Sequence, residues 1–130
     1  MAEKYRAELS EHDVATQCFD RLIERHGLLC LISEFILNET GIGDGDIQGG
    51  FSFPNIYQPW EKDTDPHYFE TGVRFNYTPD CWLDMLTYEE FVWLIEDACK
   101  SYLRNNHRDA EIVAILLEQV HDKFLNKENK

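Results

Sequence analysis

The spacing of the apolar residues changes twice along the chain, and this change constrains the fold more than any other feature of the sequence. Before residue 39 and after residue 87, apolar side chains recur every three or four residues, which is the period of an α-helix. Between residues 50 and 86 they alternate with polar ones, which is typical of strands with one buried face. This order predicts an α+β fold. We expect a single domain over residues 1–130, with N-terminal helices, a small three-stranded antiparallel sheet and two C-terminal helices.

Capping residues predict the ends of the N-terminal helices. Ser10 and Asp13 have the spacing of a capping box, so a helix should begin there. Gly27 interrupts the apolar stripe of this helix, and glycine is favoured just past a helix end. We therefore expect a break or bend at Gly27, followed by a second helical stretch over residues 28–38.

The C-terminal helices carry similar signals. Thr87 and Glu90 have the spacing of a second capping box, ahead of a helix that should end near residues 105–106. Asp109 can cap a last helix. Residues 126–130 should form a polar tail after it.

The middle of the chain contains the predicted strands and loops. Residues 40–50 include five glycines, which give the backbone too much freedom for regular structure, so we interpret this stretch as a loop. Alternating side chains predict strands over residues 50–54, 68–77 and 81–86. Residues 55–67 contain two prolines and several acids, and should form an exposed loop instead of a tight hairpin turn.

The start of the chain and its cysteines are consistent with a cytoplasmic protein. No apolar run approaches the roughly 18 residues that span a bilayer, and the first six residues lack the charged-then-apolar order of a signal peptide. The cysteines are far apart, with no Cys-x-x-Cys motif, and three lie among apolar neighbours. We expect reduced thiols at Cys18, Cys30, Cys81 and Cys99.

The charge of the chain is strongly negative and is concentrated in its middle. The 25 acidic residues outnumber the 12 basic ones, which gives a formal net charge of −13. Residues 39–97 alone contain 13 acids and two bases, whereas residues 1–38 carry −3 and residues 98–130 carry +1. A protein that neutralises phosphate groups needs a surplus of Lys and Arg. This balance therefore argues against direct binding to nucleic acid or an anionic membrane, and predicts a basic partner.

Aromatic residues lie among the central acids, and we interpret the two together as a binding surface. Aromatic side chains bury a large area at low rotamer cost and are frequent in interface hot spots. For any single residue, a solvated acidic face beside a packed sheet is the alternative. The acids of the surface should steer or ion-pair with the partner, while its tyrosines and tryptophan act as apolar anchors. The predicted binding residues are Tyr57, Trp60, Glu61, Asp63, Asp65, His67, Tyr68 and Glu70.

The sequence contains no pattern that predicts a catalytic residue, a metal or a cofactor. Asp44 and Asp46 match the opening of a calcium-binding EF-hand loop, but the twelfth position is Asn55 instead of an acid, which favours a flexible turn. His26 and Cys30 could share a helix face, yet no second metal-like pair accompanies them, so core packing is favoured. Nucleophile elbows, phosphate loops and dinucleotide fingerprints are absent from the sequence.

Four short segments, in this order, give the chain a resemblance to a known family. They are residues 51–54 (FSFP), 72–75 (GVRF), 88–91 (YEEF) and 98–103 (ACKSYL). Over residues 28–120 the chain resembles the immunity proteins of contact-dependent growth inhibition systems, of the type that protects bacteria from ribonuclease toxins. The resemblance implies a small, non-enzymatic cytoplasmic protein that binds and blocks a toxin domain.

The resemblance and the charge lead to the same interpretation. A nuclease attracts a polyanion and so carries a basic cleft, which an acidic inhibitor can enter and occlude. We expect the chain to neutralise a cognate nuclease toxin as a monomer in a 1:1 complex. The alternative is an acidic interaction adaptor or nucleic-acid mimic that binds another basic protein. A large secreted toxin gene immediately upstream would favour the first interpretation.

Overall fold

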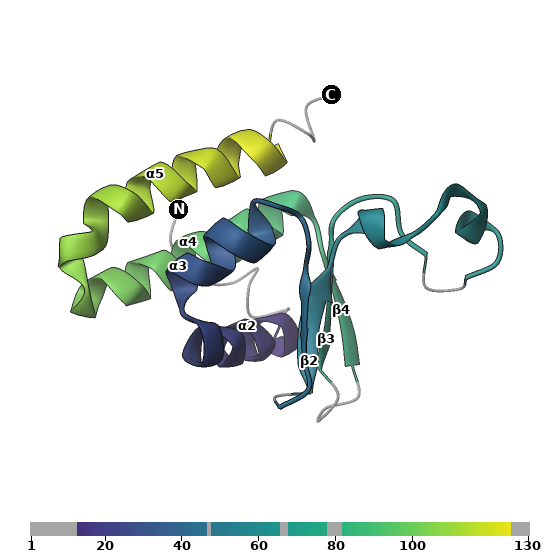
Figure 1. Ribbon diagram of the computed structural model, residues 1–130, viewed down its shortest axis with the longest axis horizontal. Helices are drawn as coiled ribbons and strands as arrows, with labels where there is room; N and C mark the ends of the chain where they lie inside the picture. The colour runs from purple at the N-terminus through teal and green to yellow at the C-terminus, as the bar shows by residue number, and fades with distance from the viewer. Residues whose placement is uncertain (1–12, 47, 66–67, 78–81, 126–130) are drawn as a thin grey trace.

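A computed structural model describes residues 13–46, 48–65, 68–77 and 82–125 of the chain. In chain order, the helices and strands are α2 (Asp13–His26), α3 (Leu28–Cys30), β1 (Ile42–Asp44), β2 (Gly49–Ser52), β3 (Val73–Tyr77), β4 (Trp82–Leu86), α4 (Tyr88–Asn105) and α5 (Ala110–Val120). Two π-helical turns continue α3 and α5, namely η2 (Leu31–Ile36) and η7 (His121–Leu125). The helices gather on one face of the sheet, while the segment between β2 and β3 extends away from the other face (Figure 1). This arrangement confirms the predicted α+β class.

The break predicted after the first helix is confirmed at Gly27. The amide of Gly27 donates a hydrogen bond to the carbonyl of Ile23 at 2.8 Å, and its φ of 88° is one that L side chains rarely adopt. The chain resumes at once as α3 and η2, so the second helical stretch is confirmed as far as Ile36. Ser10, the other half of the predicted capping box, lies outside the described residues.

The described residues form a sheet of four strands, so the prediction of three was wrong. Its order is β1-β2-β3-β4, with every neighbouring pair antiparallel. The missed strand, β1, lies within residues 40–50, which the glycine content had marked as a loop. Gly43 faces Gly50 across this pair, and a Cβ on Gly50 would lie 1.9 Å from the carbonyl oxygen of Ile42. Glycine is needed here for the close approach of two strands, and composition alone does not distinguish that need from loop flexibility.

β2 and β3 are shorter than their predicted ranges. β2 ends at Ser52, and β3 begins at Val73 instead of residue 68. Between Val73 and Tyr77 the odd positions are buried and the even ones half-buried, as expected for a strand with one covered face. The predicted third strand is confirmed as β4 from Trp82, and Cys81 lies outside the described residues.

The two predicted C-terminal helices are confirmed as α4 and α5. At the start of α4 the amide of Glu90 donates to the Thr87 hydroxyl at 3.0 Å, and the amide of Thr87 donates to the Glu90 carboxylate at 2.8 Å. These two bonds are the predicted capping box. Asp109 occupies the N-cap position of α5, as predicted, but its side chain makes no bond to a helix amide. It accepts a 2.5 Å hydrogen bond from the hydroxyl of Tyr102 instead. This bond holds the start of α5 against α4.

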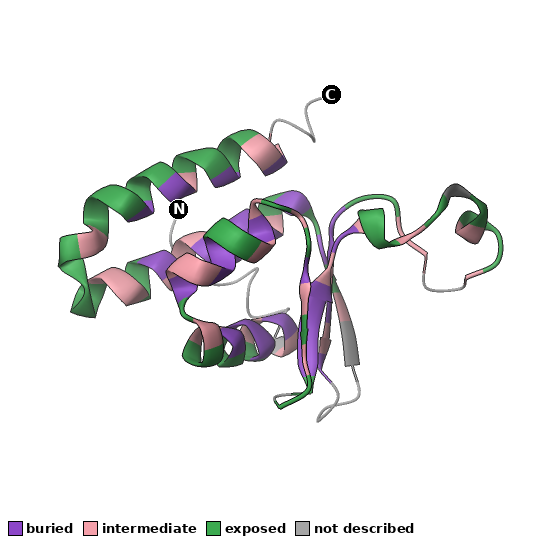
Figure 2. Ribbon diagram, in the orientation of Figure 1, coloured by how far each residue is buried: buried purple, intermediate pink, exposed green. Residues whose placement is uncertain are grey.

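Buried residues gather where the helices face the sheet (Figure 2), and phenylalanine is frequent among them. The ring of Phe51 on β2 is central, because its centroid lies within 6.5 Å of four other rings, three on α2, β3 and α4 and one, Phe53, just after β2. Edge-to-face and tilted pairs of this kind are favoured by the charge distribution of aromatic rings. The fully buried phenylalanines are Phe19, Phe51, Phe53, Phe75, Phe91 and Phe124.

The cysteines described by the structure are free thiols. Cys18 and Cys99 lie in the core, where burial raises their pKa values to about 11 and about 12. Burial in apolar surroundings disfavours the thiolate, so both thiols should be chemically inert. Cys30 is only half-buried.

Candidate functional site

The segment between β2 and β3 projects from the body of the molecule, and we call residues 54–72 the arm. The structure describes the arm except for residues 66–67. Within it the chain makes two short 3-10 turns, η3 (Pro54–Ile56) and η4 (Pro59–Lys62), each of which has proline at its start. Most described arm residues are exposed or half-buried (Figure 2). The predicted exposed loop is therefore confirmed, with some helical structure of its own.

Four side chains pack together where the arm joins the sheet. The ring of Tyr57 lies 5.1 Å from that of Tyr68 and 5.7 Å from that of Phe69, measured between centroids. Arg74, on β3, donates a 2.6 Å hydrogen bond from Nη1 to the hydroxyl oxygen of Tyr57. The Arg74 guanidinium carbon also lies 5.6 Å from the Tyr57 ring and 5.1 Å from the Phe69 ring. We call Tyr57, Tyr68, Phe69 and Arg74 the arm cluster.

Two of the predicted acids have partners inside the arm. Glu61 accepts a 2.7 Å hydrogen bond from the amide of Gln58 and so completes a capping box at the start of η4. Glu70 lies 3.0 Å from the ammonium group of Lys62, and this hydrogen bond raises the lysine pKa. Both side chains of the Lys62–Glu70 pair are more than half exposed, so the pair contributes little to stability.

Trp60 is the most exposed large apolar side chain among the described residues, at 69%. It belongs to η4, at the far end of the arm (Figure 1). Ile56 on η3 is 46% exposed, and Asp63, which follows η4, is also exposed. An exposed indole beside a carboxylate, on a projecting segment, has the composition of an interface hot spot.

The predicted binding residues thus fall into two groups. Trp60, Asp63 and Glu70 are exposed. The half-buried residues are Tyr57 and Tyr68, which belong to the arm cluster, and Glu61 and Asp65. His67 lies outside the described residues. The sequence interpretation did not include Phe69 or Arg74. Arg74 could have been singled out, because residues 39–97 contain only one other basic residue.

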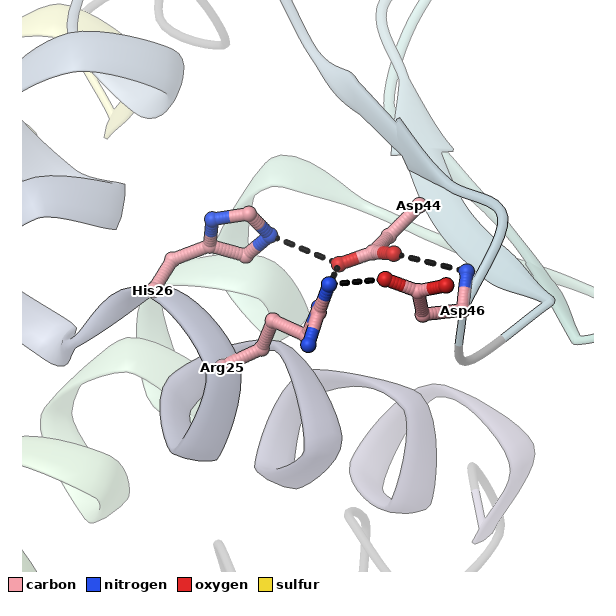
Figure 3. Close-up of polar contacts among 4 residues, drawn as sticks. All are labelled: Arg25, His26, Asp44 and Asp46. Carbon is pink, nitrogen blue, oxygen red and sulfur yellow. Dashed lines mark hydrogen bonds and ion pairs between the residues drawn. The ribbon is translucent and has the colours of Figure 1, made fainter.

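Asp44 and Asp46, the candidate calcium ligands, face basic side chains of α2 (Figure 3). One oxygen of Asp44 lies 3.2 Å from Nε of Arg25 and 2.8 Å from Nε2 of His26, and the other accepts a 2.9 Å bond from the amide of Asp46. Asp46 itself pairs with Arg25. The two carboxylates therefore tie the β1–β2 hairpin to the end of α2.

A metal centre is not supported by the described part of the chain, where no three His, Cys, Asp or Glu side chains are grouped to hold an ion. His26 and Cys30, the metal-like pair of the sequence, have different partners. His26 contacts Asp44, while the thiol of Cys30 lies 3.4 Å from the carboxylate of Glu34. Of the described helices, none has both the length and the apolar character needed to cross a membrane.

Comparison of the sequence with known protein families identifies the family of this chain. Residues 11–117 match the family described as CDI immunity protein, where CDI stands for contact-dependent growth inhibition. The chain belongs to this family. Family membership supports an immunity function against a toxin and implies that this CDI immunity protein binds a cognate toxin. The comparison with curated proteins and the comparison with solved structures gave no significant match.

The matched region of this CDI immunity protein is wider than the resemblance at residues 28–120 on its N-terminal side. It begins at residue 11 and so includes the whole of α2. It also spans the arm and the arm cluster. The family match therefore covers the candidate binding segment and the helices from α2 to the first part of α5.

Proposed function

We propose that this CDI immunity protein neutralises a basic nuclease toxin, of the ribonuclease type, by inserting the arm into the active-site cleft of the toxin. The complex is 1:1 between a monomeric immunity protein and the toxin domain, in the cytoplasm of the protected cell. Inhibition is by occlusion, so the immunity protein needs no catalytic group. The observation that carries this proposal is the exposed Trp60 beside acidic residues on a projecting arm.

The charge of the chain supports a basic partner. With 25 acids against 12 bases, the molecule attracts a positively charged surface over a distance of about 10 Å at ordinary ionic strength. Electrostatic attraction of this kind raises the rate of encounter more than it raises the final affinity. A cleft that binds RNA must be positively charged, and it is also where an inhibitor of modest size blocks activity most directly.

Within the arm, the side chains have separate roles in this proposal. Trp60 is the apolar anchor, and Asp63 is the exposed carboxylate beside it, with Asp65 and Glu70 adding to the local field. Glu61 caps η4 and thereby sets the position of Trp60 on that turn.

The arm assignment is tested by reversing one charge. Asp63→Lys should slow association with the cognate toxin domain and make the association rate less dependent on salt, because a steering charge has been replaced by a repulsive one. The matched control is Glu118→Lys, which makes the same change in charge at an exposed position of α5. Stopped-flow association rates over a range of salt concentrations give the comparison. If the two variants behave alike, the arm is not the surface that meets the toxin.

The nuclease class is tested separately from the surface. The isolated toxin domain should degrade RNA, and one equivalent of the immunity protein should abolish the degradation. Competition between the immunity protein and a non-cleavable RNA analogue would place inhibition at the active site. A toxin domain that cleaves only DNA, or that has no nuclease activity, would contradict the ribonuclease assignment and leave the immunity function in place.

A further inference from the structure

Arg74 connects the arm to the sheet, and its contacts suggest a role that the proposed function leaves open. We propose that Arg74 is a positioning residue, which holds the arm in its toxin-binding shape before the toxin arrives. The inference rests on the proposed function, because it assumes that the arm is the toxin-binding surface. It also reassigns Tyr57 and Tyr68, which act as internal supports of the arm instead of anchors in the toxin.

The arm cluster contains residues from both limbs of the arm. Tyr57 belongs to the limb that leaves β2, whereas Tyr68 and Phe69 belong to the limb that returns to β3. The Tyr57 ring contacts both returning residues, at 5.1 Å and 5.7 Å between centroids. Arg74 touches both limbs as well, through its 2.6 Å bond to the Tyr57 hydroxyl and its position 5.1 Å from the Phe69 ring. One side chain of the sheet therefore joins the two limbs to each other and to β3.

The chemistry of arginine suits this position. A guanidinium group is planar, so it can lie against an aromatic ring while its N–H groups donate hydrogen bonds in the same plane. Lysine has the same charge but neither the planar shape nor the fork of donors. The prediction is therefore specific to arginine at residue 74, and charge alone should not replace it.

Ordering the arm in advance matters for binding. A connection of this length samples many conformations unless its own contacts restrict them, and a binding partner must otherwise supply the free energy that orders it. The arm cluster lies near the sheet, while Trp60 lies on η4 at the far end. Fixing both limbs at the base restricts the positions that Trp60 can reach.

Substitution at Arg74 should leave the core intact. The flanking residues Val73 and Phe75 are fully buried against the helices, while Arg74 is half-buried on the opposite face of the sheet. Arg74→Gln removes the planar cation without placing a charge or a void in the core. The matched control is Arg104→Gln, which makes the same change in charge at an exposed residue of α4.

The first experiment uses hydrogen exchange in the free immunity protein and needs no toxin. In Arg74→Gln and Arg74→Lys, the amides of Tyr57 and Tyr68, which donate to carbonyls within the arm at 3.1 Å, should exchange about tenfold faster. Amides of β3 and β4 should exchange at their original rates, as should all amides of Arg104→Gln. Unchanged exchange in the arm of the Arg74 variants would overturn the inference.

The second experiment measures binding of the same variants to the cognate toxin domain. Arg74→Gln and Arg74→Lys should bind about tenfold more weakly than Arg104→Gln, mainly through faster dissociation. Full binding by Arg74→Lys would mean that only the charge matters, and would overturn the positioning role. Full binding by both Arg74 variants would also overturn the positioning role. In that case, Trp60→Ala tests whether the proposed function fails as well. If Trp60→Ala weakens binding, the proposed function survives; if it does not, the arm is not the toxin-binding surface.

Discussion

At the scale of single residues, the Asp44 carboxylate joins the end of α2 to the β1–β2 hairpin. Its side chain is only 8% exposed and lies within 3.2 Å of both Arg25 and His26. Asp44→Asn should lower the free energy of unfolding by about 1–3 kcal/mol, because a charge-assisted hydrogen-bond acceptor is lost at a largely buried position. Asp46→Asn is the matched control, since the Asp46 side chain is 68% exposed and its loss should cost about 0.5 kcal/mol or less. Urea denaturation measures both, and equal losses would contradict the role given to Asp44.

The residues of the arm show what a sequence can predict at this scale and what it cannot. The exposure of Trp60 and Asp63 follows from their place in a long polar connection, and both were predicted as binding residues. The partners of Tyr57 were not predictable, because Arg74 lies 17 positions further along the chain and meets Tyr57 only once β3 has formed. A tyrosine that supports a loop and a tyrosine that binds a partner have the same neighbours in sequence. Only the folded structure separates the two roles.

At the scale of secondary-structure elements, the β1–β2 pair depends on a glycine. A Cβ on Gly50 would lie 1.9 Å from the Ile42 carbonyl oxygen, whereas a Cβ on Gly43, its partner in the pair, would meet nothing within 4 Å. Gly50→Ala should therefore lower the free energy of unfolding by about 2–4 kcal/mol, because β1 must move away from β2. Gly43→Ala should change it by about 0.5 kcal/mol or less. Thermal denaturation compares the two variants. Similar melting temperatures for both would contradict the close-approach role of Gly50.

The elements that could be predicted are those with local chemical signals. The helix α4 has a capping box and a long apolar stripe, and the break at Gly27 needs only one residue with a positive φ. β1 has no such signal, because its three residues include a single apolar side chain, Ile42, and so show no alternation. The alternation continues through residues 68–72, yet these residues precede β3, and Tyr68 and Phe69 pack against Tyr57 within the arm. The spacing of apolar residues indicates which side chains are buried, but it does not indicate which part of the molecule buries them.

At the scale of the whole molecule, several of the central acids contact basic side chains of the terminal segments. Asp44 and Asp46 pair with α2, while Glu39 lies 3.2 Å from Lys123 and Glu96 lies 3.3 Å from His121. Arg25 and Lys123, which lie in the terminal segments, thus neutralise acids of the middle that are far from them in sequence. A count along the chain locates the excess of charge but not its partners, so only exposed acids such as Asp63 remain candidates for steering a toxin.

The net charge of the molecule should also make its stability dependent on salt. A formal charge of −13 opposes compaction through repulsion among acids, and salt screens this repulsion. Screening also weakens the ion pairs, but 25 acids face only 12 bases, so relief of repulsion should dominate. We expect the melting temperature to rise by about 2–5 °C between about 20 mM and about 500 mM NaCl. The variant Glu111→Gln/Glu118→Gln, which removes two exposed acids of α5, should show a smaller rise. A melting temperature that falls with added salt would mean that the ion pairs outweigh the repulsion.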